Sequence, residues 1–252
     1  MLNEILTLDI YRFFMIFSRL SAALMLFPAF GGRLVSTRIR LLFALALSLL
    51  LLPVVGTQFP PLPRHVGGLI LLIGSEALIG LYLGVVTQVL MSSLNIAGTF
   101  IGFQIGLTNA FSFDAVAEQQ SSTLTALLAN IALLAILATD MHHLMLRALA
   151  DSYATFIPGQ ALPLDDFSET LGHLMSASFG FGIQAAAPIL AFGLIFNVGL
   201  GLLSRLAPQI QVFFVGLPLQ VIAGLWMLMV ALPLIVMSFL RWYEAGLMPF
   251  VR

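Results

Sequence analysis

The chain has 252 residues, of which 60% are hydrophobic and only 8% charged, and its mean hydropathy is +1.08. Soluble domains carry about 25% charged residues, so this composition identifies an integral membrane protein. The net charge is -1 and the ten basic residues, all arginine, are scattered along the chain, which argues against a nucleic-acid partner. With no cysteine, the chain cannot form a disulfide or a thiolate metal site.

Hydrophobic runs of about 20 residues, the length that crosses a bilayer as a helix, indicate about six spans. The expected spans are Ile10–Phe30, Leu41–Val55, a long run from Val66, Leu124–Asp140, Leu174–Leu203 and Val212–Leu240. The sequence therefore predicts an all-α integral membrane protein, a single membrane domain over residues 1–252, with kinked and tightly packed helices. Arginines after the first span and at the C-terminus give conflicting positive-inside signals, so the membrane orientation stays open.

The third run is the longest of these. It continues without proline from Val66 to Gln104, nearly twice the length of a bilayer-spanning helix of about 20 residues, so it either extends beyond the membrane or breaks near Ser92. It also contains a carboxylate, Glu76, in an apolar environment. By default such a residue marks an intramembrane functional site, and the alternative is a packing contact with an arginine or an amide.

A stretch of small residues ends this run. Gly98, Gly102 and Gly106 recur every four residues, which allows close approach of a neighbouring helix. The pattern then breaks, and Phe111 and Phe113 appear in a polar segment that includes Asp114. Bulky rings between two membrane spans must lie in surroundings formed by protein or water, because irregular backbone exposed to lipid is not tolerated.

Recognisable catalytic chemistry is absent from the sequence. There is no lysine for a phosphate-binding loop, and no His-Glu-x-x-His helix for a zinc protease. Ser112 and Ser121 lack the glycine-flanked turn of a serine nucleophile. We therefore expect no enzyme activity and no cofactor.

Two adjacent histidines follow the fourth span. Neighbouring residues on a helix point about 100° apart, so His142 and His143 do not form a chelating pair by themselves. No further ligand is evident at helical spacing, and we expect a hydrogen-bonding role at a helix end and no metal site.

Several short motifs follow one another along the chain. The first is A-G-x-x-I-G-x-Q-x-G at Ala97–Gly106, followed by Asp114 and Gln119. The others are Asp140-Met141-His142-His143, Ala187-Pro188, and the run from Gly199 and Gly201 through Ser204-Arg205-Leu206-Ala207 to Pro208 and Gln209. In this order the motifs resemble those of the FliR family, a membrane component of the export gate of bacterial flagella, whose relatives in injectisomes are the SctT proteins. The chain departs from the family pattern at Ala115, where proline is frequent, and at Gln211, where asparagine is usual.

The resemblance implies a core subunit of the flagellar type III protein export gate, in the inner membrane at the basal body. One copy would join FliP-type and FliQ-type membrane subunits, associate with FlhA-type and FlhB-type export proteins, and help form the channel that unfolded proteins cross. Residues 107–122 would form the channel plug, with Phe111, Phe113 and Asp114 in gating. The glycines at 98, 102, 106, 199 and 201, with Pro208 and Gln209, would serve helix packing and assembly.

Three alternatives remain at this point, and one of them is a passive assembly scaffold in which the aromatic segment with Phe111 and Phe113 is only structural. The other two are active in transport. One is an injectisome export-gate subunit, since the motifs are shared between the two systems. The other is a stand-alone multi-pass transporter, in which Glu76 would be the proton or ion site.

Overall fold

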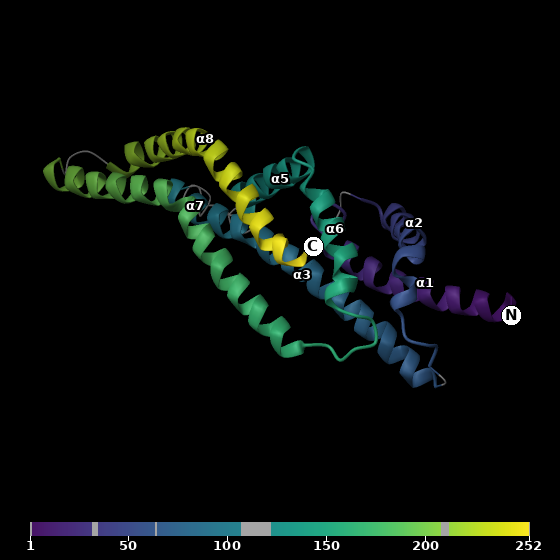
Figure 1. The fold of residues 1–252 in the computed structure, drawn as a ribbon. Helices are drawn as coiled ribbons and strands as arrows, with labels where there is room; N and C mark the ends of the chain where they lie inside the picture. The colour runs from purple at the N-terminus through teal and green to yellow at the C-terminus, as the bar shows by residue number, and fades with distance from the viewer. Residues whose placement is uncertain (1, 32–34, 64, 107–121, 208–211, 252) are drawn as a thin grey trace. The chain divides into compact units, whose positions relative to one another are not determined.

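The computed structural model describes residues 2–31, 35–63, 65–106, 122–207 and 212–251, and these residues are mostly helical, with no strand among them (Figure 1). The α-helices are α1 (Leu2–Leu26), α2 (Thr37–Val55), α3 (Val66–Ile105), α5 (Ser122–Ala138), α6 (Met141–Thr155), α7 (Leu164–Leu206) and α8 (Val212–Leu247). Two short 3-10 helices, η1 (Gly56–Gln58) and η3 (Met248–Phe250), follow α2 and α8. The all-α class is confirmed.

The number of membrane spans is smaller than the sequence predicts. Within the described residues, four helices are long and apolar enough to cross a membrane, namely α2 with η1, α3, α7, and α8 from Gly216 to Phe250. A fifth span results if α5 and α6, bent by 75° at their junction, are one broken span. The helix α1 is not among them, and its sequence explains why, because it carries Glu4, Asp9, Arg12 and Arg19. The count of six is therefore not confirmed.

The described residues divide into two compact units. The first contains Met1–Leu90, Ile136–Leu174 and Tyr243–Arg252, and the second contains Met91–Ala135 and Met175–Trp242. The helix α3 is unbroken over 40 residues and contributes to both units, so the alternative of a break near Ser92 is wrong. At 1.5 Å per residue α3 is roughly 60 Å long, about twice the hydrocarbon thickness of a bilayer.

The first unit is built around α1 and the first part of α3. The α3 side chains that are 3% exposed or less recur every three or four residues, at Ile79, Leu83, Val86 and Leu90, which is the spacing of one helix face. Glycines let α1 come close to this helix, since a Cβ at Gly80 would overlap the carbonyl oxygen of Arg19. Close backbone packing of this kind is how helices associate in lipid.

The second unit continues the same periodicity. Its buried α3 residues are Leu94, Ala97, Ile101 and Ile105, and α5 adds Leu124, Leu128 and Ala132. The other two helices contain prolines, Pro188 in α7 and Pro218 and Pro233 in α8. Figure 1 shows both helices bent, which agrees with the expected effect of a proline that lacks the N–H of the helix ladder.

The α1–α3 contact can be tested with a matched pair of glycines on α3. We expect Gly80→Ala to lower the free energy of unfolding by about 1–3 kcal/mol, because the new methyl group would push against the α1 backbone. The control is Gly74→Ala, where no described atom lies within 4 Å of the added Cβ; its helix propensity should leave stability unchanged or raise it by up to about 1 kcal/mol. Thermal unfolding of the purified chain in detergent measures both, and equal melting temperatures would contradict the contact.

Candidate functional site

The largest fully buried side chain of the first unit is an arginine. Arg19 on α1 is 0% exposed, and its guanidinium group donates three hydrogen bonds. Nε donates to Glu76 Oε2 on α3 at 2.7 Å, one terminal nitrogen to Ser152 Oγ on α6 at 3.1 Å, and the other to the Phe156 carbonyl at 3.0 Å. Its central carbon also lies 3.9 Å from the centre of the Tyr153 ring. Arg19 thus joins α1, α3 and the end of α6, and we name this set of contacts the Arg19 clamp.

The partner of this arginine is Glu76, which is also 0% exposed. Two charges in an apolar interior are stable only when they are paired and hydrogen-bonded, and the geometry here meets that condition for the guanidinium group. The sequence left two interpretations of Glu76 open, an intramembrane functional site or a packing contact. In the structure Glu76 makes the contact with an arginine. One oxygen, Oε1, has no hydrogen-bond partner among the described residues.

Aromatic rings surround the connection that follows α6. The rings of Tyr82 and Phe167 stack with their centres 3.9 Å apart, and Phe156 meets the Phe167 ring edge-on at 5.2 Å. The φ angle of Gly159 is +84°, and a Cβ there would lie 2.8 Å from Pro60 Cγ. This left-handed, closely packed position requires glycine, and it fixes the connection against the rest of the unit.

The first two glycines of the stripe contact the start of α5 in the second unit. A Cβ at Gly98 would lie 2.8 Å from Thr125 Cα, and one at Gly102 would lie 3.7 Å from Leu124. The third, Gly106, has φ +82° and follows the end of α3. A Cβ added at Gly106 would lie 3.5 Å from the side chain of Gln220. The amide of Gln220 donates a hydrogen bond to the backbone carbonyl of Gln104 at 2.8 Å. The stripe therefore lies where α3 packs against other helices of the same unit.

The remaining predicted residues fall into two groups. Gly199 and Gly201 on α7 have no described atom within 4 Å of an added Cβ, so the described part of the chain does not pack against them. The gating residues Phe111, Phe113 and Asp114, together with Pro208 and Gln209, lie outside the described residues.

His142 and His143 lie close to a third possible ligand, Asp140, which the sequence analysis did not consider. The ligand atoms of Asp140, His142 and His143 all lie within 4.8 Å of one another, and His143 Nδ1 is 3.6 Å from Asp140 Oδ1. Asp140 has a left-handed φ of 59° at the bend between α5 and α6. Sequence reasoning missed this third group because it considered only helical spacing. Since the positive end of the α6 dipole favours the carboxylate and opposes a cation, the geometry favours an aspartate–histidine pair over a metal site.

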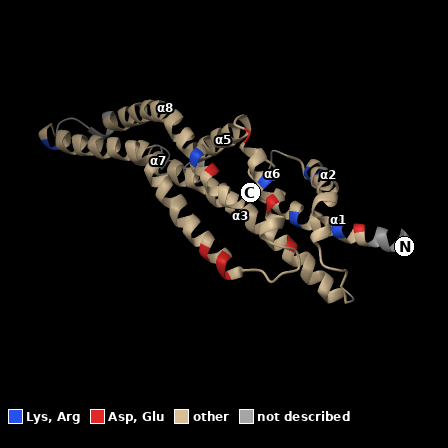
Figure 2. Cartoon of the chain, in the orientation of Figure 1, with Lys and Arg blue, Asp and Glu red and all other residues tan. Residues whose placement is uncertain are grey.

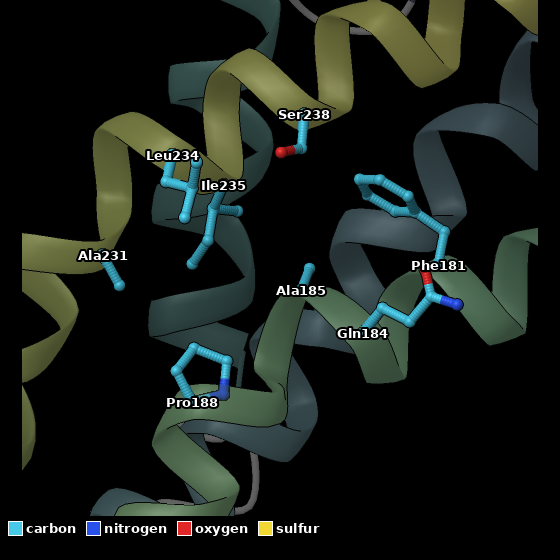
Figure 3. Close-up of a pocket in the computed structure, with 8 residues that line it drawn as sticks. All are labelled: Phe181, Gln184, Ala185, Pro188, Ala231, Leu234, Ile235 and Ser238. Atoms are coloured by element: carbon cyan, nitrogen blue, oxygen red, sulfur yellow. The ribbon is translucent and has the colours of Figure 1, made fainter.

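A cavity of about 170 Å³ lies between α7 and α8 in the second unit. Figure 3 shows Ala185 and Pro188 on α7 facing Ala231, Leu234 and Ile235 on α8. Its polar side chains are Gln184 and Ser238, and no ionisable residue lines it. Such a cavity provides packing space between the two helices.

Charged side chains are few throughout the described chain, and Figure 2 shows helices that are mostly uncharged, with neighbouring acidic residues at the start of α7. The exposed large hydrophobic side chains are most numerous on α7 and α8. Together these features define an integral membrane protein in which buried polar groups hold long apolar helices together.

Comparison with known proteins identifies the family. The family described as bacterial export proteins, family 1, matches residues 10–246. The flagellar biosynthetic protein FliR of Caulobacter vibrioides is 38% identical over 224 residues, 89% of each chain. The proteins of the same name from Bacillus subtilis and Pectobacterium carotovorum are 32% and 33% identical, and cover 88% and 89% of this chain and 86% and 85% of their own. The chain belongs to the family of bacterial export proteins, family 1, as the resemblance to FliR predicted.

The Arg19 clamp predicts strong coupling between its two charged residues. Arg19→Met and Glu76→Leu should each cost about 3–5 kcal/mol of unfolding free energy, because each leaves one buried charge without its partner. The double variant should cost less than the sum of the two by about 2 kcal/mol. Thermal unfolding of the four proteins in detergent completes the cycle.

The matched control for this cycle is Arg12→Met. Arg12 is paired with Asp9 at 3.5 Å, with side chains 30% and 50% exposed, so its loss should cost less than about 1 kcal/mol. Additive effects of the Arg19 and Glu76 variants would show that the two charges do not depend on each other.

Proposed function

We propose that this chain is a core subunit of the flagellar type III protein export gate, located in the inner membrane at the basal body. The supporting comparison is the family match over nearly the whole chain, with relatives named flagellar biosynthetic protein FliR. In this proposal it assembles with FliP-type and FliQ-type subunits, associates with FlhA-type and FlhB-type proteins, and lines a channel for unfolded proteins.

The observation that carries the proposal is the length of α3. It spans 40 residues with Glu76 as its one Asp, Glu, Lys or Arg, so an apolar helix of roughly 60 Å must be covered over its whole length. A bilayer provides hydrocarbon over about 30 Å. The remainder requires protein contacts, and a helical assembly that rises out of the membrane plane supplies them.

The low internal burial of the last two helices supports the same conclusion. In the apolar windows of α7 and α8 only 17% of the residues are buried within the chain, against 39% for α3. Such exposed apolar surface needs lipid or other subunits, and its extent favours a subunit of a larger assembly over a self-contained transporter. The transporter alternative also needs Glu76 free to exchange its ligand, whereas Glu76 is buried and bonded to Arg19.

The proposed plug is the segment 107–122, with Phe111, Phe113 and Asp114 in gating. The described residues on either side of this segment lie close together, since a Cβ at Gly102 near the end of α3 would lie 3.7 Å from Leu124 near the start of α5. In this proposal the two rings form an apolar constriction that opposes passage of ions at rest.

Native mass spectrometry of the tagged chain, extracted mildly from its host membranes, tests the proposed function. The expected result is a large assembly with one copy of this chain and several copies of two smaller apolar proteins. A stable monomer or homodimer in several detergents would overturn the export-gate proposal in favour of a transporter. Co-purification with injectisome components in place of flagellar ones would overturn the flagellar assignment.

The plug can be tested by removing both rings. Phe111→Ala combined with Phe113→Ala should raise the leak of ions or small molecules through assembled gates, because the constriction loses its apolar bulk. Leak is measured as dye or ion flux in vesicles that contain the complex, with Phe14→Ala, an exposed ring on α1, as control. Unchanged leak in a correctly assembled gate would count against a gating role for the rings.

Variants of two glycines on α7 can distinguish an effect on assembly from an effect on folding of the chain. Gly199→Leu and Gly201→Leu should reduce the yield of the assembly while leaving the melting temperature of the isolated chain unchanged, because the described residues leave open space there. The contrasting variant is Gly182→Leu, whose Cβ would lie 2.8 Å from the Ser93 carbonyl oxygen and which should destabilise the chain itself. Normal assembly of both α7 variants would exclude these positions from the interface.

A further inference from the structure

An apolar groove runs along one face of α8 in the second unit. It has a volume of about 410 Å³ and is lined by Phe192 on α7 and by residues of α8. The α8 residues follow the spacing of one helix face, and they are Leu219, Ile222, Ala223, Trp226, Met227 and Val230. Ile222, Trp226 and Val230 are 67%, 68% and 64% exposed, so the described part of the chain leaves this groove uncovered.

The length and volume of the groove match one acyl chain. Its α8 side from Leu219 to Val230 covers roughly 16 Å at about 1.5 Å per residue, which is about the depth of one leaflet in a hydrocarbon core of about 30 Å. A benzene molecule fills an apolar cavity of about 150 Å³, or about 25 Å³ for each carbon atom. At that density the groove volume of about 410 Å³ holds roughly 16 carbon atoms, the size of a common membrane acyl chain.

The chemistry of the lining selects hydrocarbon. Every side chain that lines the groove is apolar, so a polar group placed in it would lose its hydrogen bonds to water and gain none. The groove also begins close to Gly216, where the apolar stretch of α8 that can cross a membrane begins. A hydrocarbon chain of the bilayer can therefore enter the groove without leaving the lipid phase.

A positive charge lies beyond one end of the groove. α7 runs antiparallel to α8 here, because Phe192 lines the groove while Leu200, further along α7, lies beside the earlier α8 residue Gly216. A Cβ at Gly216 would be 2.9 Å from the Leu200 side chain. α7 continues roughly 8 Å past Leu200 to Arg205, which is exposed in its last turn. Arg205 therefore lies beyond the Leu219 end of the groove.

This arginine is complementary to an anion. The described residues of the second unit contain two charged side chains, Arg205 and Arg241, and both are positive. Arg241 lies near the other end of α8. A guanidinium group binds phosphate through charge-assisted, bidentate hydrogen bonds. The phosphate of a phospholipid whose acyl chain occupies the groove therefore complements the charge of Arg205.

We propose that the groove is a binding site for a phospholipid, with one acyl chain along α8 from Val230 to Leu219 and the phosphate group paired with Arg205. The apolar lining selects the hydrocarbon chain, and Arg205 selects the phosphate. A lipid bound in this way fills the groove and holds the end of α7 at the level of the headgroups. This inference goes beyond the proposed function, since lipid binding is measured on the purified chain and assembly on the complex.

The two tryptophans of the chain provide the test. Trp226 lines the groove, whereas Trp242 stacks on Phe181 with the ring centres 5.5 Å apart. The variants Trp242→Phe and Trp226→Phe each leave one indole. Phosphatidylglycerol with brominated acyl chains, titrated into the delipidated full chain in detergent, should quench Trp226 to saturation at one lipid per chain. Quenching of Trp242 should be weak and should not saturate.

Two pairs of variants in the Trp242→Phe background separate the parts of the site. Arg205→Gln should weaken saturable quenching roughly tenfold, because a charge-assisted bond is lost, whereas Arg241→Gln should stay within about twofold. Ala223→Phe fills the groove and should also weaken binding roughly tenfold. Its control is Leu225→Phe, at an exposed α8 position outside the lining. Melting temperatures show whether each variant folds.

A second lipid tests the role of the phosphate. Brominated diacylglycerol, which lacks it, should bind roughly tenfold more weakly than brominated phosphatidylglycerol. Equal binding of the two lipids, or equal effects of the Arg205 and Arg241 variants, would overturn the phosphate contact. Quenching of Trp226 that rises without saturation would show a general lipid-facing surface and overturn the site. Protection of Trp226 in the native assembly, with no saturable binding by the purified chain, would assign the groove to a partner subunit.

Discussion

The first unit depends on a single constraint, which is that a guanidinium group buried among apolar helices must have all of its donors satisfied. Arg19 meets this requirement by drawing groups from three places in the chain to one point, Glu76 on α3, Ser152 on α6 and the carbonyl of Phe156. Apolar packing tolerates many similar arrangements, whereas charged hydrogen bonds tolerate few. The clamp therefore specifies how these helices meet, and the close approach at Gly80 makes room for it.

The two units solve the packing problem by different means. In the first, a buried ion pair is combined with stacked rings around Tyr82. In the second, closely packed glycines on α3 and an amide, Gln220, make the contacts between helices, and no ion pair is found among its described residues. Lipid provides little hydrophobic driving force for helix association. Both units therefore rely on close helix packing and on hydrogen bonds between polar groups inside the protein.

Much of the fold was predictable because its signals are local. Hydropathy and the absence of proline predicted the long helix from Val66, which the structure extends to Ile105. Partners far apart in the sequence were not predictable, because nothing at Glu76 indicates that its arginine lies 57 residues earlier. The span count was less secure for a related reason, since hydropathy alone counts α1 as a span although the partners of its buried Arg19 lie far away in the sequence. The role of Asp140 beside the histidines was missed because it depends on a left-handed residue at a helix bend.

The clamp also has a consequence for biosynthesis. The groups that Arg19 needs are encoded 57, 133 and 137 residues after it. At a synthesis rate of about 5–20 residues per second, the arginine waits roughly 3–11 seconds for its carboxylate and about twice as long for the rest. An unpaired arginine is costly at the centre of a bilayer, so a central position of α1 becomes favourable only once its carboxylate is present. We therefore expect the emerging chain to hold α1 near the membrane surface, or beside the insertion machinery, until α3 arrives.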